Sequence, residues 1–125
     1  MRLRYNGKMQ VFERTKTWLL AKNILEQLSG LEEINYRAMM GEYIIYYRGR
    51  IAGGIYDDRL LVKPTKSAVS YMTTAIYELP YEGAKEMLLV ENVDSKEYLA
   101  GLFKAMYDEL PVHKSNNKKK SMDTL

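Results

Sequence analysis

The spacing of apolar residues in the middle of the chain predicts a small antiparallel meander. Tyr and Ile dominate this region, and both suit a pleated, half-buried surface. Arg48-Gly49 and Asp57-Asp58 separate neighbouring apolar runs, and Gly49 readily supplies the positive φ that a tight turn needs. We therefore expect hairpin-linked strands over four runs: Tyr36–Met40, Glu42–Tyr47, Ile51–Tyr56 and Leu60–Val62.

Two features of this meander mark its irregular points. Gly53-Gly54 removes two side chains from the third run, which predicts a bulge or a close approach by another element. Pro64 has no backbone N–H to donate to a ladder, so it ends the last of these strands.

A helical spacing precedes the meander, over residues 18–29, with Thr15 or Thr17 as its N-terminal cap and Gly30 as its stop. We interpret Trp18, on the apolar face of this helix, as a core anchor. The positions that define the face are Trp18, Ala21, Ile24, Leu25 and Leu28.

A second amphipathic helix is predicted over Asp94–Leu110, where Asp94 and Glu97 have capping-box spacing and Pro111 stops the continuation. Its apolar face consists of Leu99, Leu102, Phe103, Met106 and Leu110. Between the meander and this helix we expect a short helix, a loop and one strand that joins the sheet: Thr65–Met72, Tyr77–Gly83 and Met87–Val90. The expected class is α+β, with a mostly antiparallel sheet (the meander plus one later strand) flanked by N-terminal and C-terminal helices.

Charge divides the 125 residues into three parts. Residues 1–16 hold five basic residues and one acidic residue, residues 112–125 hold four and one, and residues 17–111 hold ten and fourteen. We expect a flexible N-terminal arm over 1–14, one domain over 15–111 and a disordered Lys-rich tail over 112–125. The acidic body argues against a nucleic-acid site on its own surface. The alternative is a protein that contacts nucleic acid through its basic ends, with Lys118, Lys119 and Lys120 as the candidates.

Candidate chemistry is sparse in this sequence. Without Cys there is neither a disulfide nor a thiolate site, which fits a reducing cytoplasm. The single His, His113, lies at the edge of the tail, and the adjacent acids are typical of solvated turns and helix ends. No apolar run has the length of a membrane span. We expect no enzyme activity, no catalytic residue, no metal site, no cofactor and no membrane association.

The order YRAMMGEYIIYYRGRIAGGIYDDRLLVKP, followed by LPYEGAKEMLLVE and a helix ending in LP, resembles the TfoX (Sxy) N-terminal domain family. The resemblance covers about Leu20 to Pro111. It rests on an Arg-x-Met-Phe-Gly strand, with Met40 in place of Phe, then a Tyr-rich strand and a Leu-x-Leu-Lys-type ending. The matching positions are Arg37, Met39, Met40, Gly41, Tyr43, Tyr46, Gly49 and Leu60–Lys63.

The resemblance implies an α+β fold similar to secretion chaperones, here as a stand-alone domain without the family's second domain. It also implies a non-enzymatic role in regulating DNA uptake competence, together with a catabolite-activator-type transcription factor. We expect a protein-interaction module, in which a homodimer is one option. Its candidate interaction residues are Arg37, Met39, Met40, Gly41 and Tyr43.

Overall fold

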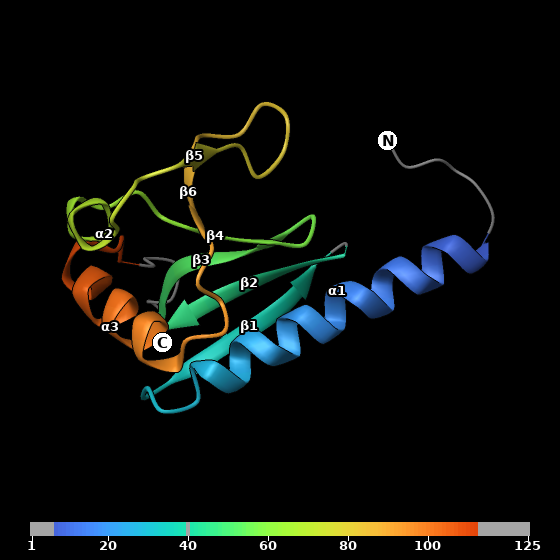
Figure 1. The fold of residues 1–125 in the computed structure, drawn as a ribbon, viewed down its shortest axis with the longest axis horizontal. Coiled ribbons are helices and arrows are strands. Elements are labelled where there is room, and N and C mark those ends of the chain that lie inside the picture. Colours follow the sequence, from blue (N-terminus) through green and yellow to red (C-terminus); the bar gives the residue numbers. More distant parts are fainter. Residues whose placement is uncertain (1–6, 40, 113–125) are drawn as a thin grey trace, which may run out of the picture.

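The computed structural model describes residues 7–39 and 41–112, with side chains described from residue 17 onward. Within those residues, three α-helices accompany one six-stranded antiparallel sheet of order β1-β2-β3-β4-β6-β5 (Figure 1). The helices are α1 (Gly7–Gln27), α2 (Lys66–Tyr71) and α3 (Lys96–Met106), and a 3₁₀ turn, η1 (Tyr107–Glu109), follows α3. The strands are β1 (Ile34–Met39), β2 (Glu42–Tyr47), β3 (Arg50–Tyr56), β4 (Arg59–Val62), β5 (Tyr77–Glu78) and β6 (Met87–Val90). The expected α+β class, with a meander, a later strand and flanking helices, is confirmed.

Both predicted hairpin turns are present, and each uses two residues of positive φ. Arg48 and Gly49 have φ of 51° and 83°, and Asp57 and Asp58 have φ of 55° and 64°. Positive φ at both central residues gives a turn whose twist matches that of the flanking strands. Local turn chemistry therefore sets the register of β2 with β3 and of β3 with β4.

The glycine pair in β3 lies at an irregular point of the ladder, as predicted. Ile45 pairs with Gly53 while Tyr46 pairs with Ile51, so Ala52 is an extra residue on β3. A Cβ on Gly53 would collide with the Leu61 carbonyl oxygen of the neighbouring strand. The predicted bulge and close approach are thus both found in β3.

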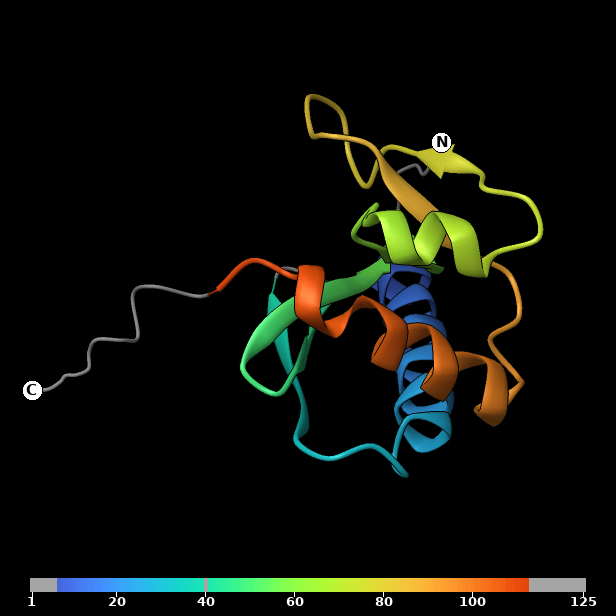
Figure 2. The ribbon, with the colours of Figure 1, turned by 90° about the vertical axis from the view of Figure 1, so that its left-hand side faces the viewer.

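The core lies between the helices and one face of the sheet, which we call the covered face. Buried side chains of α1 and α3, among them Ile24 and Phe103, join Ile45, Ile55 and Val62 of the strands in one cluster. The axes of α1 and α3 cross beside the sheet (Figure 2). The Asn23 side-chain amide donates to Asp94 at 3.1 Å and links α1 to the segment before α3. The predicted apolar residues Leu99, Leu102, Phe103, Met106 and Leu110 are buried as expected. The predicted helix end at Leu110 is wrong, because α3 ends at Met106 and Leu110 follows η1.

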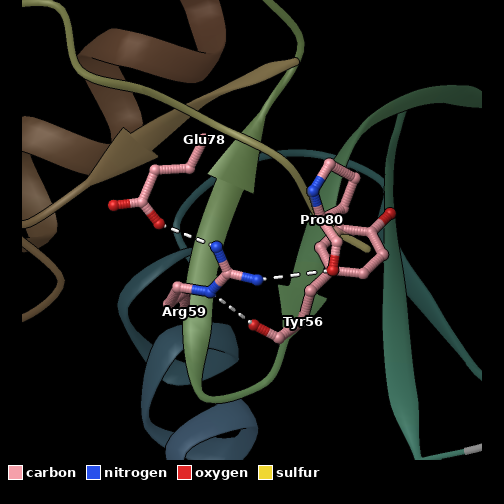
Figure 3. Close-up of polar contacts among 4 residues, drawn as sticks. All are labelled: Tyr56, Arg59, Glu78 and Pro80. Carbon is pink, nitrogen blue, oxygen red and sulfur yellow. Dashed lines mark hydrogen bonds and ion pairs between the residues drawn. The ribbon is translucent and has the colours of Figure 1, made fainter. Parts of the chain in front are cut away.

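The opposite side of the sheet, the outer face, holds a smaller cluster of Tyr56, Leu61 and Met87. Arg59 holds the β5–β6 loop against it (Figure 3). Its guanidinium bonds Glu78 at 2.7 Å and the carbonyl oxygens of Tyr56 and Pro80 at 3.2 and 3.3 Å. One side chain therefore joins β3, β4 and the loop.

Several element boundaries differ from those predicted. Helix α1 begins at Gly7, so a cap at Thr15 or Thr17 is wrong, and residues 7–14 of the predicted arm are helical. Early residues of mixed polarity gave no apolar period, yet they continue the helix in the N-terminal direction. Tyr77 and Glu78, predicted as loop, pair with β6 as the short strand β5. Backbone pairing with a strand ten residues away has no local sequence signal.

The two later helices have side-chain caps. Helix α2 was predicted, and Thr65 caps it by accepting a bond from the Ala68 amide at 3.1 Å. The predicted Asp94 cap of α3 is wrong, because Ser95 occupies that position and accepts from the Tyr98 amide at 3.1 Å. Ser and Asp are both good caps, so their adjacency made the choice ambiguous from sequence.

Candidate interaction surface at the first strand

The structure divides the predicted interaction residues between the two faces of the β1–β2 hairpin. Alternation along the strands places Arg37 and Met39 on the outer face and Tyr43 on the covered face. Gly41 is in the connecting turn with φ of 85°, and Met40 lies outside the described residues. The described residues of this set are therefore close in sequence, but their side chains lie on opposite faces of the sheet.

A cluster of three aromatic rings lies where α1 passes over the hairpin, and we call it the aromatic surface: Trp18, Tyr36 and Tyr43. The ring centroids are 6.2 Å apart for Trp18–Tyr36, 5.9 Å for Trp18–Tyr43 and 6.1 Å for Tyr36–Tyr43. These separations and the tilted planes are typical of favourable aromatic pairs. Trp18 keeps 38% of its surface exposed and Tyr36 keeps 46%. The cluster is packed within itself and open to solvent on one side.

The interpretation of Trp18 as a core anchor is wrong. Ala21, Ile24 and Leu28 of the same helical face are fully buried, whereas Trp18 lies beyond them over the edge of the sheet. Helical spacing identifies a face but does not show where the sheet beneath it ends. The sequence signal that was missed is Tyr36. Tyr36 and Tyr43 lie on the same face of the paired strands β1 and β2, so their rings are neighbours.

Strand β1 has an open edge next to the aromatic surface. Five of its six residues are exposed, and no described strand pairs with its outer side. The Arg48 amide donates to the Glu33 carbonyl at 2.9 Å, so these residues form a bonded pair of the β1–β2 ladder. Bonded and non-bonded pairs alternate in antiparallel ladders. The backbone N–H and C=O groups of Ile34, Tyr36 and Ala38 therefore point away from β2.

The turn end of the hairpin carries carboxylates. Burial, and next the charge of Asp57, raise the pKa of Glu42 above its ordinary value of 4.5. The Thr17 hydroxyl donates to Asp58 at 2.8 Å, which fastens α1 to the β3–β4 turn. Arg37 is exposed in the middle of β1. Glu42 at the start of β2 and the aspartates of the β3–β4 turn thus lie at the same end of the sheet, and a cation lies halfway along the edge strand β1.

Other candidate chemistry lies elsewhere or outside the described residues. Among described residues, no three His, Cys, Asp or Glu side chains are grouped as metal ligands would be. A surface hollow is lined by Lys66, Ser67, Ser70 and Tyr71 of α2, none of which belongs to the β1–β2 hairpin. His113 and Lys118–Lys120 lie outside the described residues. No described helix is long and apolar enough to cross a bilayer.

The family model "TfoX N-terminal domain" matches residues 26–103, which is more than half of the chain. An uncharacterized 12.7 kDa protein in the trpE 5′ region of Spirochaeta aurantia is 27% identical over 70 residues, or 56% of this chain. The match spans 61% of that relative's length. No solved structure matches the chain. The matched region runs from the end of α1 through the whole sheet into α3, and the chain belongs to the TfoX N-terminal domain family.

Proposed function

We propose that this chain is a non-catalytic protein-interaction module of transcription regulation, and that its partner docks on the aromatic surface. The partner class is a catabolite-activator-type transcription factor, as the resemblance to competence regulators implies. The observation that carries the proposal is the exposure of Trp18 and Tyr36 within a packed three-ring cluster. Most large apolar side chains of this fold are instead in the core.

The chemistry of the aromatic surface supports protein docking. Trp and Tyr are enriched at the energetic centres of protein interfaces, because they bury large areas while losing few rotamers. The cluster is already ordered by its ring contacts, so docking would cost little further conformational freedom. Exposed Arg37 and Met39 lie on the outer face of β1, opposite the three rings, and would contribute only to a partner that also contacts the edge of β1.

Calorimetric titration with the purified transcription factor tests this proposal. Tyr36→Ala should weaken binding by about tenfold or more, the size of effect found at interface hot spots. Tyr77→Ala is the matched control, because Tyr77 is similarly exposed, at 47%, but belongs to β5 at the other edge of the sheet. Equal affinity of wild type and Tyr36→Ala would contradict the docking site.

A second readout reports directly on the surface. The chain has a single Trp, so fluorotryptophan labelling gives one fluorine resonance from Trp18. Partner binding should shift it, and Tyr77→Ala should leave the shift unchanged. If removal of residues 113–125 abolishes binding while Tyr36→Ala does not, the contact belongs to the Lys-rich tail instead of the aromatic surface.

A further inference from the structure

The open edge of β1 has the pattern of a strand that pairs with itself. We propose that β1 of one chain pairs antiparallel with β1 of a second copy, centred on Tyr36, so that two six-stranded sheets become one continuous sheet. This inference is carried by the backbone edge of β1. Tyr36 belongs both to that edge and to the aromatic surface, so the tests below measure dimerisation separately from binding of the transcription factor.

Two independent observations show which backbone groups of β1 point away from β2. The Arg48–Glu33 bond marks one end of the β1–β2 ladder, and the two-residue connection between Met39 and Glu42 makes that closing pair a bonded one at the other end. Both give the same alternation, so it is Ile34, Tyr36 and Ala38 that turn their N–H and C=O groups outward.

The outward backbone groups of β1 also define the register between the two copies. A two-fold axis at Tyr36 sets Tyr36 opposite its own copy and Ile34 opposite Ala38 of the second copy, which uses every outward group of the strand. An axis at Asn35 or at Arg37 leaves one of the three outward residues outside the pairing. The axis at Arg37 also sets two like charges opposite each other, which is destabilising.

Side chains agree with the Tyr36-centred register. On the outer face, Asn35 would lie opposite Arg37 of the second copy, so an amide oxygen would accept a bond from a guanidinium at two symmetric places. On the covered face the two Tyr36 rings would be neighbours, and the two aromatic surfaces would adjoin across the axis. The same patch thus serves both copies, as a two-fold interface requires.

Strand β1 has few of the features that protect an edge strand. Natural edge strands are blunted by charged side chains, Pro, bulges, short length or a covering segment. Strand β1 has six residues, contains neither Pro nor Lys, pairs with β2 without a register shift, and has Arg37 as its one charged residue. Helix α1 lies on the covered face, where Trp18 contacts rings of β1 and β2. The opposite edge, β5, has only two residues.

Sedimentation or light scattering over a concentration series measures the assembly directly. The native chain, of 14.6 kDa, should approach twice that mass as concentration rises. Ala38→Pro removes only an outward N–H, so the monomer should fold while dimerisation weakens by about tenfold or more. Asn35→Asp should strengthen the dimer by setting a carboxylate opposite Arg37. A monomer at all concentrations that still binds the transcription factor would overturn the dimer and leave the proposed function intact.

Cross-linking tests the register. The chain lacks Cys, so a single introduced thiol is unambiguous. Bonded antiparallel partners have Cα atoms about 5.5 Å apart, within the range of a disulfide. Tyr36→Cys should therefore form a disulfide-linked dimer on oxidation. Ala38→Cys is the matched control, since its two copies would be about four residues of strand apart. Equal cross-linking of both variants, or of neither while a dimer is present, would overturn the Tyr36-centred pairing.

Discussion

The guanidinium of Arg59 forms an ion pair of 2.7 Å with the carboxylate of Glu78, and each side chain is about a third exposed. The same guanidinium bonds two backbone carbonyls, at Tyr56 and Pro80. Arg59→Ala should lower the free energy of unfolding by about 1–2 kcal/mol, because two carbonyls and a carboxylate lose a charged donor. Urea denaturation measures this. Arg37→Ala, a change at an exposed Arg of the other edge, should cost about 0.5 kcal/mol or less.

Hydrogen exchange provides a local check on the same pair. In Arg59→Ala, the amides of residues 79–86 should exchange faster, since the loop is no longer held against β4. Unchanged exchange in this loop together with a lower denaturation midpoint would place the contribution of Arg59 in the β3–β4 turn instead.

Replacement of the α3 cap discriminates between two neighbouring residues. Ser95→Ala should cost about 1 kcal/mol, because the Tyr98 amide loses the oxygen that satisfies it. Asp94→Ala should cost less, about 0.5 kcal/mol, since only an exposed bond from Asn23 is lost. Thermal and urea unfolding of both variants measure the difference. The reverse order would restore Asp94 as the cap.

A methyl group at Gly53 tests the close approach of β3 and β4. Gly53→Ala would place a Cβ against the Leu61 carbonyl oxygen and should destabilise the fold by about 1–3 kcal/mol or more. Gly30→Ala is the control, because its Cβ would meet only the Lys96 side chain, at 3.5 Å. That variant should remain within about 0.5 kcal/mol of wild type. Similar midpoints for the two variants would show that the strands can separate without cost.

Glu42 should make the fold less stable as the solution becomes less acidic. Its pKa is raised in the folded state, by burial and then by Asp57, so its favourable contribution exists below the ordinary value of 4.5. That contribution is lost as pH rises through the folded pKa. Glu42→Gln should therefore be more stable than wild type at pH 7 and lose this advantage near pH 4. Urea midpoints across that range measure it, and parallel profiles would contradict the assignment.

Glu109 should behave in the opposite sense. The Ser67 hydroxyl, and next the Ser67 amide, hold the pKa of Glu109 below its ordinary value of 4.5. A lowered carboxyl pKa contributes stability above the unfolded value and loses it as pH falls. Glu109→Gln should thus be less stable than wild type at pH 7, with the two converging in acid. A chemical-shift titration of the Glu109 carboxyl carbon provides an independent measurement of the direction.

The hairpins were predictable because their information is local. Arg48-Gly49 and Asp57-Asp58 occupy the two central positions of tight turns. Such turns place the apolar runs on either side in adjacent antiparallel strands. The face of α3 was equally clear, since its period continues from Leu99 to Leu110. The ends of elements were harder, because the start of α1 and the pairing of Tyr77 with β6 depend on no nearby residue type.

The sequence predicted candidate interaction residues in the first hairpin without assigning them to its two faces. The family pattern drew attention to residues 37–43, and period-two alternation necessarily sends Arg37 and Tyr36 to opposite faces. Which face is covered depends on helices far away in the chain. The prediction that Trp18 is buried was wrong for the same reason. The apolar stripe of a helix does not show where the sheet beneath that helix ends.

The two-residue length of β5 limits how far these molecules could polymerise. A sheet grows only by adding strands at its two edges, and amyloid-like fibres need both edges to accept a neighbour. Here the β1 edge is six residues long, whereas the β5 edge has only two residues to pair. Association through β1 would use the long edge of each molecule, so growth would stop at a closed dimer instead of a filament.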